Sequence, residues 1–342
     1  MFRPLRRCGE ALDATARLWR PCPGGARVLT DLSGAKARRG SKIEPDPTRP
    51  IAHFLEDERR VDGSLVPVLT VLLAGAECPF TCVFCDLWRR TLDGPTPAGA
   101  IPRQLAHALS NTGPLPDTCA VKLYNASNFF DPRAVPPADD AAIAALVAPF
   151  GRVTVECHPR LVDRRCLQFA DRMPGRLEVA MGLETADEEA LAHLNKGMTL
   201  ADFDSAAATL EHAGIALRVF VLLPAPFVPA GRAVQSTLHA VRHAVDRGAA
   251  HVTVIPTRVG NGALDQLREQ GVWTPPTVDM LDEAVEACVR ISGAVVTVDV
   301  WDIDRLPTCR RCGPARIARL RRFNRTGQPG APVPCHACTS SS

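Results

Sequence analysis

Between residues 66 and 301, β-branched apolar runs alternate with longer amphipathic runs, and this alternation limits the possible folds more than any other feature. Strands that alternate with helices predict βαβ units and a parallel sheet. Six or seven consecutive units favour an α/β fold of the partial (β/α)6 TIM-barrel type, whose active site gathers at the C-terminal ends of the strands. The predicted strands lie at 66–74, 119–126, 152–158, 176–184, 216–224, 251–256 and 294–301.

Helices are predicted between these strands. In 98–110, Ile101, Leu105 and Leu109 recur at four-residue spacing and form one apolar face. The other predicted helices lie at 138–149, 161–172, 186–194, 200–213, 231–247 and 277–292.

The length of 342 residues suits such a barrel with appendages. We expect an N-terminal extension over 1–65, with one short helix near 9–19, because that segment is mixed in charge and little periodic. After this extension we expect a core barrel over 66–300, and then a small C-terminal metal-binding module over 301–342.

Composition excludes some functions and favours others. A net charge of +3 provides no global attraction to nucleic acid. The longest apolar run, 66–76, is too short to span a bilayer, so no membrane association is expected. Without the apolar core of a secretory signal at the N-terminus, the expected location is the cytoplasm. Thirteen cysteines in such a chain then favour metal or redox chemistry over disulfides.

Cys78, Cys82 and Cys85 follow the end of the first predicted barrel strand, in the stretch "CPFTCVFC". Three thiolates can hold three irons of a 4Fe–4S cluster and leave the fourth iron open to a small molecule. The alternatives are a cysteine-rich loop without metal, or three of the four ligands of a zinc ion.

This motif, together with the stretch 177–227 that contains "MGLET" and "NKG", resembles the radical S-adenosylmethionine (SAM) superfamily. It is most similar to the subgroup of the Elongator catalytic subunit, the methylthiotransferases and coproporphyrinogen dehydrogenase. The resemblance covers 66–300, and within it "KLYNASNFFD" is similar to a bacterial group. It implies a cofactor and a mechanism but does not identify the substrate.

The resemblance implies that SAM binds the open iron of the cluster. An electron from a reductant such as flavodoxin or ferredoxin then splits its carbon–sulfur bond and releases a 5′-deoxyadenosyl radical. The expected substrate is RNA or a small metabolite. The alternative is a non-catalytic metal-cluster or nucleic-acid-binding protein on a barrel scaffold, but such a protein has little need of an open iron.

Four residues are predicted to bind the cofactor. Glu184 of "MGLET" matches the superfamily's polar residue near the cofactor, and the alternative is an ordinary strand-end carboxylate. Lys196 is placed to balance the cofactor carboxylate, unless it is a solvated helix-end lysine. Asn125 and Ser127 stand where the superfamily has a glycine-rich stretch; these glycines are absent here, so backbone carbonyls would take their place.

Three further residues are candidates for catalysis. Tyr124, the single tyrosine of the chain, is placed to relay hydrogen or hold substrate, with simple packing as the alternative. His158 ends the third predicted strand and faces the barrel mouth, although a lone histidine is more often structural. Glu156 lies two residues earlier on the same face.

A second group of cysteines lies near the C-terminus. Cys309 and Cys312 form one Cys-x2-Cys pair, Cys335 and Cys338 form another, and 22 residues separate the two pairs. Two such knuckles favour one tetrahedral zinc ion. An auxiliary iron–sulfur cluster or the absence of metal are the alternatives.

The segment 310–325 between the knuckles holds seven arginines and is predicted to be a basic helix. If the substrate is polyanionic, Arg319, Arg321 and Arg322 are expected to contact phosphates. A solvated face that packs Ile317 and Leu320 on the barrel is the favoured alternative, because the chain as a whole is nearly neutral.

Overall fold

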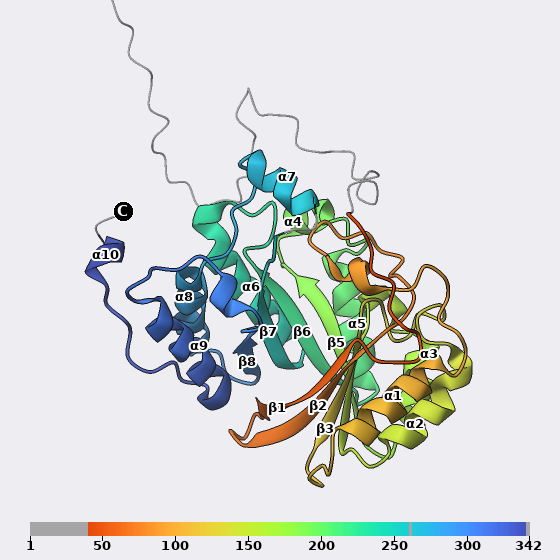
Figure 1. The fold of residues 1–342 in the computed structure, drawn as a ribbon. Coiled ribbons are helices and arrows are strands. Elements are labelled where there is room, and N and C mark those ends of the chain that lie inside the picture. Colours follow the sequence, from red (N-terminus) through yellow and green to blue (C-terminus); the bar gives the residue numbers. More distant parts are fainter. Residues whose placement is uncertain (1–39, 260–261, 340–342) are drawn as a thin grey trace, which may run out of the picture. The chain divides into compact units, whose positions relative to one another are not determined.

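The computed structural model describes residues 40–259 and 262–339 (Figure 1). Its eight strands form one sheet in chain order, with β1 antiparallel to β2 and each later strand parallel to the one before it. The strands are β1 Ala52–Arg59, β2 Leu65–Leu73, β3 Ala120–Asn125, β4 Arg152–Glu156, β5 Arg176–Glu184, β6 Ala216–Leu223, β7 Ala249–Pro256 and β8 Val295–Val298.

Helices cover the outer face of this curled sheet (Figure 1). None of the described helices is long and apolar enough to cross a membrane. The curled sheet of mostly parallel strands, with helices on its outer face, confirms the predicted α/β partial barrel. The helices are α1 Ala100–Asn111, α2 Asp140–Val147, α3 Arg164–Asp171, α4 Glu188–His193, α5 Leu200–His212, α6 Ala233–Asp246, α7 Ala263–Glu269, α8 Val278–Cys288, α9 Gly313–Thr326 and α10 His336–Thr339.

All seven predicted strands form within a few residues of their expected bounds, but β1 was not predicted. It lies within the expected N-terminal extension and pairs with β2 along its whole length, from Ala52 opposite Leu72 to Arg59 opposite Leu65. Its sequence, AHFLEDER, lacks an apolar alternation because charged side chains on this strand pair within the barrel. The predicted helix near 9–19 lies outside the described residues.

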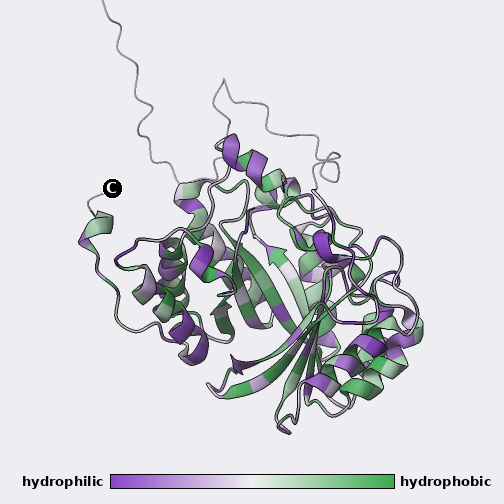
Figure 2. Ribbon diagram, viewed as in Figure 1, coloured by the Kyte–Doolittle hydropathy of each residue, from purple (hydrophilic) through white to green (hydrophobic). Residues whose placement is uncertain are grey.

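The two faces of the sheet differ in character. Side chains that point outward toward the helices are apolar, such as Val121, Val179 and Val219, each fully buried. Their neighbours along the strands point into the barrel and are polar or charged, such as Lys122 and Arg218. Figure 2 shows the strands mostly in the green of hydrophobic residues, interrupted by paler and purple positions.

Arg218 is the centre of a buried ion-pair network inside the barrel. Its Nε donates to Glu178 Oε2 over 2.8 Å, and its two terminal nitrogens donate to Glu58 over 2.5 and 3.0 Å. Lys122 Nζ lies 3.3 Å from Glu58 and 3.0 Å from Glu56. These contacts join β1, β3, β5 and β6, so they anchor β1 to the rest of the barrel.

Side chains also connect the two edge strands, β1 and β8. Arg59 donates to the carbonyl oxygen of Val296 over 2.9 Å. Asn324 of α9 accepts from Val298 N over 2.8 Å and donates to Val298 O over 2.7 Å. This amide therefore occupies backbone groups of β8 that a further strand would otherwise use.

Candidate active site and metal centre

The three cysteines of the predicted cluster lie in the loop that follows β2, at the C-terminal edge of the parallel strands, as expected. All three are partly buried. Burial raises the pKa of the Cys82 thiol to about 12; Lys196 opposes this shift, whereas Cys85 and Cys78 add to it. Lys196 thus favours the thiolate form of Cys82.

A turn that follows α4 holds this cysteine loop in place. Asn195 Nδ2 donates to Thr81 O over 3.0 Å and to Thr81 Oγ1 over 2.7 Å. Val83 N donates to Leu194 O over 3.0 Å. Asn195 and Gly197 both have positive φ, 53° and 72°, so the backbone turns sharply on either side of Lys196. The sequence "NKG" thus connects the cysteine loop to the lysine.

Glu184 and Lys196 form a buried ion pair, with 2.5 Å between Lys196 Nζ and Glu184 Oε1. Burial alone would lower the pKa of Lys196, but the Glu184 carboxylate together with Cys82 and Cys78 outweighs this effect and raises the pKa. A Cβ on Gly182 would lie 2.0 Å from the carboxylate oxygen, so only glycine leaves room for the pair. This explains the Gly-x-Glu spacing in physical terms.

Asn125 ends β3 and Ser127 lies just past it, and each carries a buried polar atom without a partner among the described residues. Asn125 Oδ1 accepts from Ser127 N over 2.9 Å. Asn125 Nδ2 and Ser127 Oγ have no hydrogen-bond partner among the described residues. Unpaired buried polar atoms are uncommon in folded proteins and call for a ligand or an ordered water. These two atoms therefore suit a polar cofactor, and the predicted residues fit such a group.

Asn128 is a site residue that the sequence did not single out. Its Nδ2 donates to Cys78 Sγ over 3.4 Å, and its Oδ1 accepts from His158 N over 2.6 Å. It belongs to the segment "YNASNFF", where the only available signal was its closeness to Asn125.

His158 lies beneath the cysteine loop. Its ring stacks on Phe80, with 3.7 Å between ring centroids, and its Nε2 lies 2.9 Å from Lys196 O. Its Nδ1 accepts from Arg160 N over 3.2 Å, so Nε2 carries the proton and donates. Burial, with Lys196 nearby, lowers the pKa of His158 to about 3, so the ring is neutral. These contacts position the loop, and the predicted catalytic role stays a prediction.

Tyr124 and Glu156 lie deeper, on the inner face of β3 and β4. Burial raises the pKa of Glu156 to about 8, although Asn125 N donates to its carboxylate over 3.2 Å. Burial also raises the pKa of Tyr124 well above its usual value. The ring of Tyr124 meets Phe220 edge-on at 6.1 Å. The predicted catalytic residues thus line the interior between the cysteine loop and the ion-pair network.

The four C-terminal cysteines come together as predicted. Their sulfur atoms all lie within 4.8 Å of one another, and they are the only such metal-binding group among the described residues. Cys309 Sγ lies 3.9 Å from Cys335 Sγ, and Cys312 Sγ lies 3.7 Å from Cys338 Sγ. Backbone N–H groups of Cys312 and Arg311 lower the pKa of the Cys309 thiol to about 6. This group can hold a single metal ion.

The predicted basic helix forms as α9, but its arginines divide between two faces. Arg319 is 5% exposed and pairs with Asp282 and Glu286 of α8. Arg316 Nη1 also contacts Asp282, over 2.6 Å. The expectation that Arg319 contacts phosphates is therefore wrong, because it clamps α9 to α8. Arg321, Arg322 and Arg325 are exposed, and we call them the α9 arginine face.

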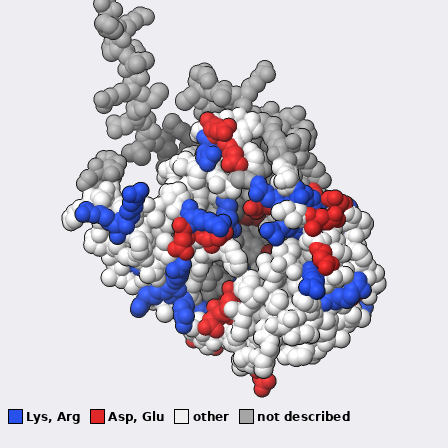
Figure 3. All heavy atoms as spheres, in the orientation of Figure 1, with Lys and Arg blue, Asp and Glu red and all other residues white. Residues whose placement is uncertain are grey.

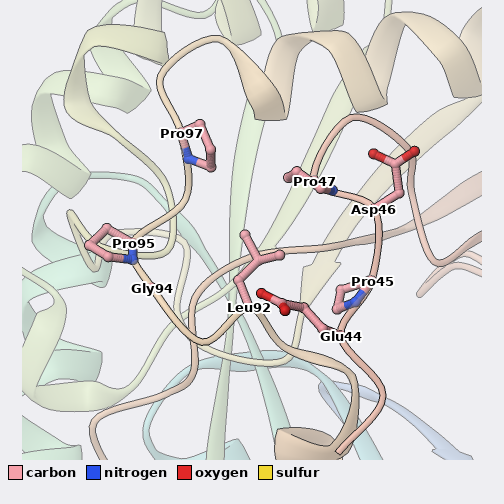
Figure 4. A pocket seen from close by; sticks show the side chains of 8 residues that line it. All are labelled: Glu44, Pro45, Asp46, Pro47, Leu92, Gly94, Pro95 and Pro97. Atoms are coloured by element: carbon pink, nitrogen blue, oxygen red, sulfur yellow. The ribbon is translucent and has the colours of Figure 1, made fainter.

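A separate surface pocket of about 460 Å³ lies between 44–47 and 92–97 (Figure 4). Figure 4 shows prolines and the carboxylates of Glu44 and Asp46 around it. It includes none of the predicted site residues.

A partial α/β barrel with three cysteines after its first parallel strand is the arrangement expected for the radical SAM class, which this chain resembles. Archaeosine synthase subunit beta of Methanosarcina acetivorans is 26% identical over 309 residues, which cover 85% of this chain and 88% of that protein. No protein-family profile matches the chain.

Two solved structures are also similar to this chain at low identity. The radical SAM methyltransferase from Sphaerobacter thermophilus has a TM-score of 0.48 at 16% identity, covering 75% of this chain and 79% of its own. The archaeal Elp3 of Methanocaldococcus infernus has a TM-score of 0.47 at 12% identity, covering 67% and 56%.

Proposed function

We propose that this chain is a radical SAM enzyme that holds a 4Fe–4S cluster at Cys78, Cys82 and Cys85 and cleaves SAM reductively. One observation carries the proposal: the three-thiol loop is fastened directly to the turn that bears the buried Glu184–Lys196 pair. When bound, the reduced cluster supplies the electron that breaks the carbon–sulfur bond of SAM. A low-potential donor such as flavodoxin or ferredoxin, in the cytoplasm, is the proposed source of that electron.

The protein's own residues have distinct parts in this proposal. Lys196 offsets the negative charge of thiolates and of a bound carboxylate, while Glu184 keeps it charged and in place. The free donors on Asn125 and Ser127 are available to bind polar groups of SAM. Asn128 donates to Cys78 Sγ, and hydrogen bonds to the sulfurs are one factor that sets the potential of a cluster. Glu156, with its pKa of about 8, is protonated near neutral pH and can give a proton to a reacting group.

RNA is the proposed substrate. The M. acetivorans relative is named as subunit beta of archaeosine synthase, and this similarity supports RNA as the substrate. The α9 arginine face gives independent support, because exposed arginines suit a phosphate backbone. A small metabolite remains the alternative substrate, and a non-catalytic binding protein remains the alternative class.

Zinc is the proposed metal of the C-terminal cysteines. A tetrahedral ion with Zn–S bonds of about 2.3 Å places its sulfurs about 3.8 Å apart. The separations of 3.7 and 3.9 Å match this geometry. A 4Fe–4S cube would separate the four sulfurs further, because each binds a different iron.

The experiment that tests the enzyme proposal is anaerobic reconstitution with iron and sulfide. We expect brown protein that bleaches with dithionite and converts SAM to 5′-deoxyadenosine, measured by mass spectrometry. Addition of unmodified tRNA should increase turnover and yield an altered nucleoside in the digest. Colourless, iron-free protein after reconstitution would favour the non-catalytic alternative.

Glu184→Ala is expected to weaken SAM binding by about 1.5–3 kcal/mol, because a hydrogen bond to a charged group is lost and Lys196 is left unpaired. The measurement is calorimetric titration of the reconstituted protein with SAM, and the cluster itself should still assemble. The matched control is Glu188→Ala, which removes an exposed carboxylate on α4. This variant should bind SAM normally. Unchanged affinity in the Glu184 variant would make that residue an ordinary strand-end carboxylate.

Metal analysis of the reconstituted protein is expected to find about one zinc and about four irons per chain. Cys335→Ala should lose the zinc and keep the iron, because its thiol belongs only to the C-terminal group. Cys78→Ala should show the reverse. About eight irons without zinc would instead indicate an auxiliary cluster.

A further inference from the structure

Trp301 is a large aromatic residue that the protein leaves exposed. Its accessible fraction is 57%, whereas Trp88 and Trp273 are 4% and 3% exposed. It lies just after β8, and the C-terminal ends of parallel strands meet at one edge of a barrel. The cysteine loop follows β2 at that same edge. Trp301 therefore stands at the rim of the barrel mouth.

Several contacts hold Trp301 in place. Arg258, which follows β7, donates to Trp301 O over 3.1 Å and to Asp299 Oδ2 over 2.6 Å. Asp299 Oδ1 accepts from Trp301 N over 2.8 Å. Asp302 has a φ of 57°, so the chain turns sharply directly after the tryptophan. The main chain of Trp301 is therefore anchored on both sides while most of its ring stays in solvent.

The ring also borders the opening between the two edge strands. Phe54 of β1 contacts it, with ring centroids 5.2 Å apart at an angle of 41°. Figure 3 shows a hollow on this face of the molecule, between the side that carries α8 and α9 and the side that carries α1 to α3. A flat ligand that enters between β1 and β8 would thus meet the indole first.

An ion pair links the segment after Trp301 to α9. Arg321 lies 3.1 Å from Asp304, which is three residues after Trp301. This ion pair connects α9 to the turn that follows Trp301, and Figure 3 shows basic side chains gathered over α9. The surface pocket near 44–47 offers carboxylates instead, and these repel phosphate.

We propose that this surface binds single-stranded RNA, with phosphates along the α9 arginine face and one base stacked on Trp301 at the barrel mouth. The proposal rests on RNA being the substrate of the proposed enzyme. An aromatic platform beside a basic track is the usual combination for single-stranded nucleic acid, because every base has a flat π-face. Stacking at the rim would position the neighbouring nucleotide to enter the barrel toward Tyr124 and Glu156.

The test is binding of a short, unstructured, fluorescein-labelled RNA of alternating C and A residues, measured by anisotropy. Trp301→Ala should weaken binding about tenfold, and Trp301→Phe, which keeps a stacking ring, should bind within about threefold of wild type. Trp301→Leu keeps apolar packing on Phe54 and should bind as poorly as Trp301→Ala. Val61→Ala, which removes another exposed apolar side chain, should have no effect.

Salt dependence separates the two parts of the surface. Trp301→Ala should leave the slope of log affinity against log salt unchanged, because the indole carries no charge. Arg322→Gln combined with Arg325→Gln should flatten the slope by about 1.4, at about 0.7 for each phosphate contact with a single strand. SAM cleavage without RNA should match wild type in every variant.

The outcomes distinguish the stacking proposal from the proposed enzyme function on which it rests. If wild type binds RNA and Trp301→Ala or Trp301→Leu binds it equally well, the stacking proposal is wrong and the enzyme proposal stands. If wild type binds no RNA, RNA is not the substrate and both the substrate assignment and the stacking site are wrong.

Discussion

Replacement of Cys78, Cys82 or Cys85 by alanine is expected to abolish conversion of SAM to 5′-deoxyadenosine. Each thiolate is proposed to hold one iron, so the loss of any one opens a second corner of the cluster to solvent and oxidation. The measurement is product formation with dithionite as reductant, together with iron content after anaerobic reconstitution. Both should fall to the background of protein that was not reconstituted.

Cys119→Ala and Cys288→Ala are the matched controls. Both side chains are buried, at 2% and 3% exposure, and neither lies in the cysteine loop. We expect these variants to keep nearly full iron content and turnover. Full turnover by any of the three loop variants would contradict the assignment of the cluster.

Arg218→Met is expected to destabilise the fold by about 3–5 kcal/mol, the usual cost of removing one partner from a buried ion pair. It would leave Glu58 and Glu178, which are 8% and 1% exposed, without their main counter-charge. The measurement is urea unfolding followed by circular dichroism. Arg247→Met, which removes a solvent-exposed ion pair with Asp204, is the control and should leave the midpoint nearly unchanged. An equally stable Arg218 variant would mean that the network contributes little.

The pH dependence of this variant has a defined sign. In the wild type, burial would raise the pKa of Glu58 and of Glu178, but Arg218 and its neighbours outweigh this effect and hold both below the ordinary value of 4.5. The stability that they contribute is thus present above pH 4.5 and is lost as pH falls through the lower folded-state values. Without Arg218, burial raises these pKa values instead. The variant should therefore gain stability relative to wild type as pH falls from 7 toward 5.

The parallel strands could be located from the sequence because their outward side chains are packed against helices. Val121, Val179 and Val219 belong to apolar runs that are recognisable without any tertiary information. The strand β1 could not be located in this way. Glu58 is charged, and its burial makes sense only once Arg218, 160 residues away in the chain, is known to face it.

For the same reason, the cysteine loop could be predicted from the sequence, whereas the residues that contact it could not. Short spacing along the chain brings Cys78, Cys82 and Cys85 together, so the sequence indicates the cluster loop by itself. The hydrogen bond from Asn128 to Cys78 spans 50 residues, and the stacking of Phe80 on His158 spans 78. No local pattern could have indicated these partners.

The sequence by itself determined the alternation of strands and helices, the three-cysteine loop and the two C-terminal knuckles, because local periodicity and short spacing specify them. Only the tertiary structure decided which face each arginine of α9 takes. Arg319 is buried against Asp282, while Arg322, three positions later, is exposed. That difference depends on the packing of α8 against α9. A local sequence pattern does not specify such contacts between separate elements.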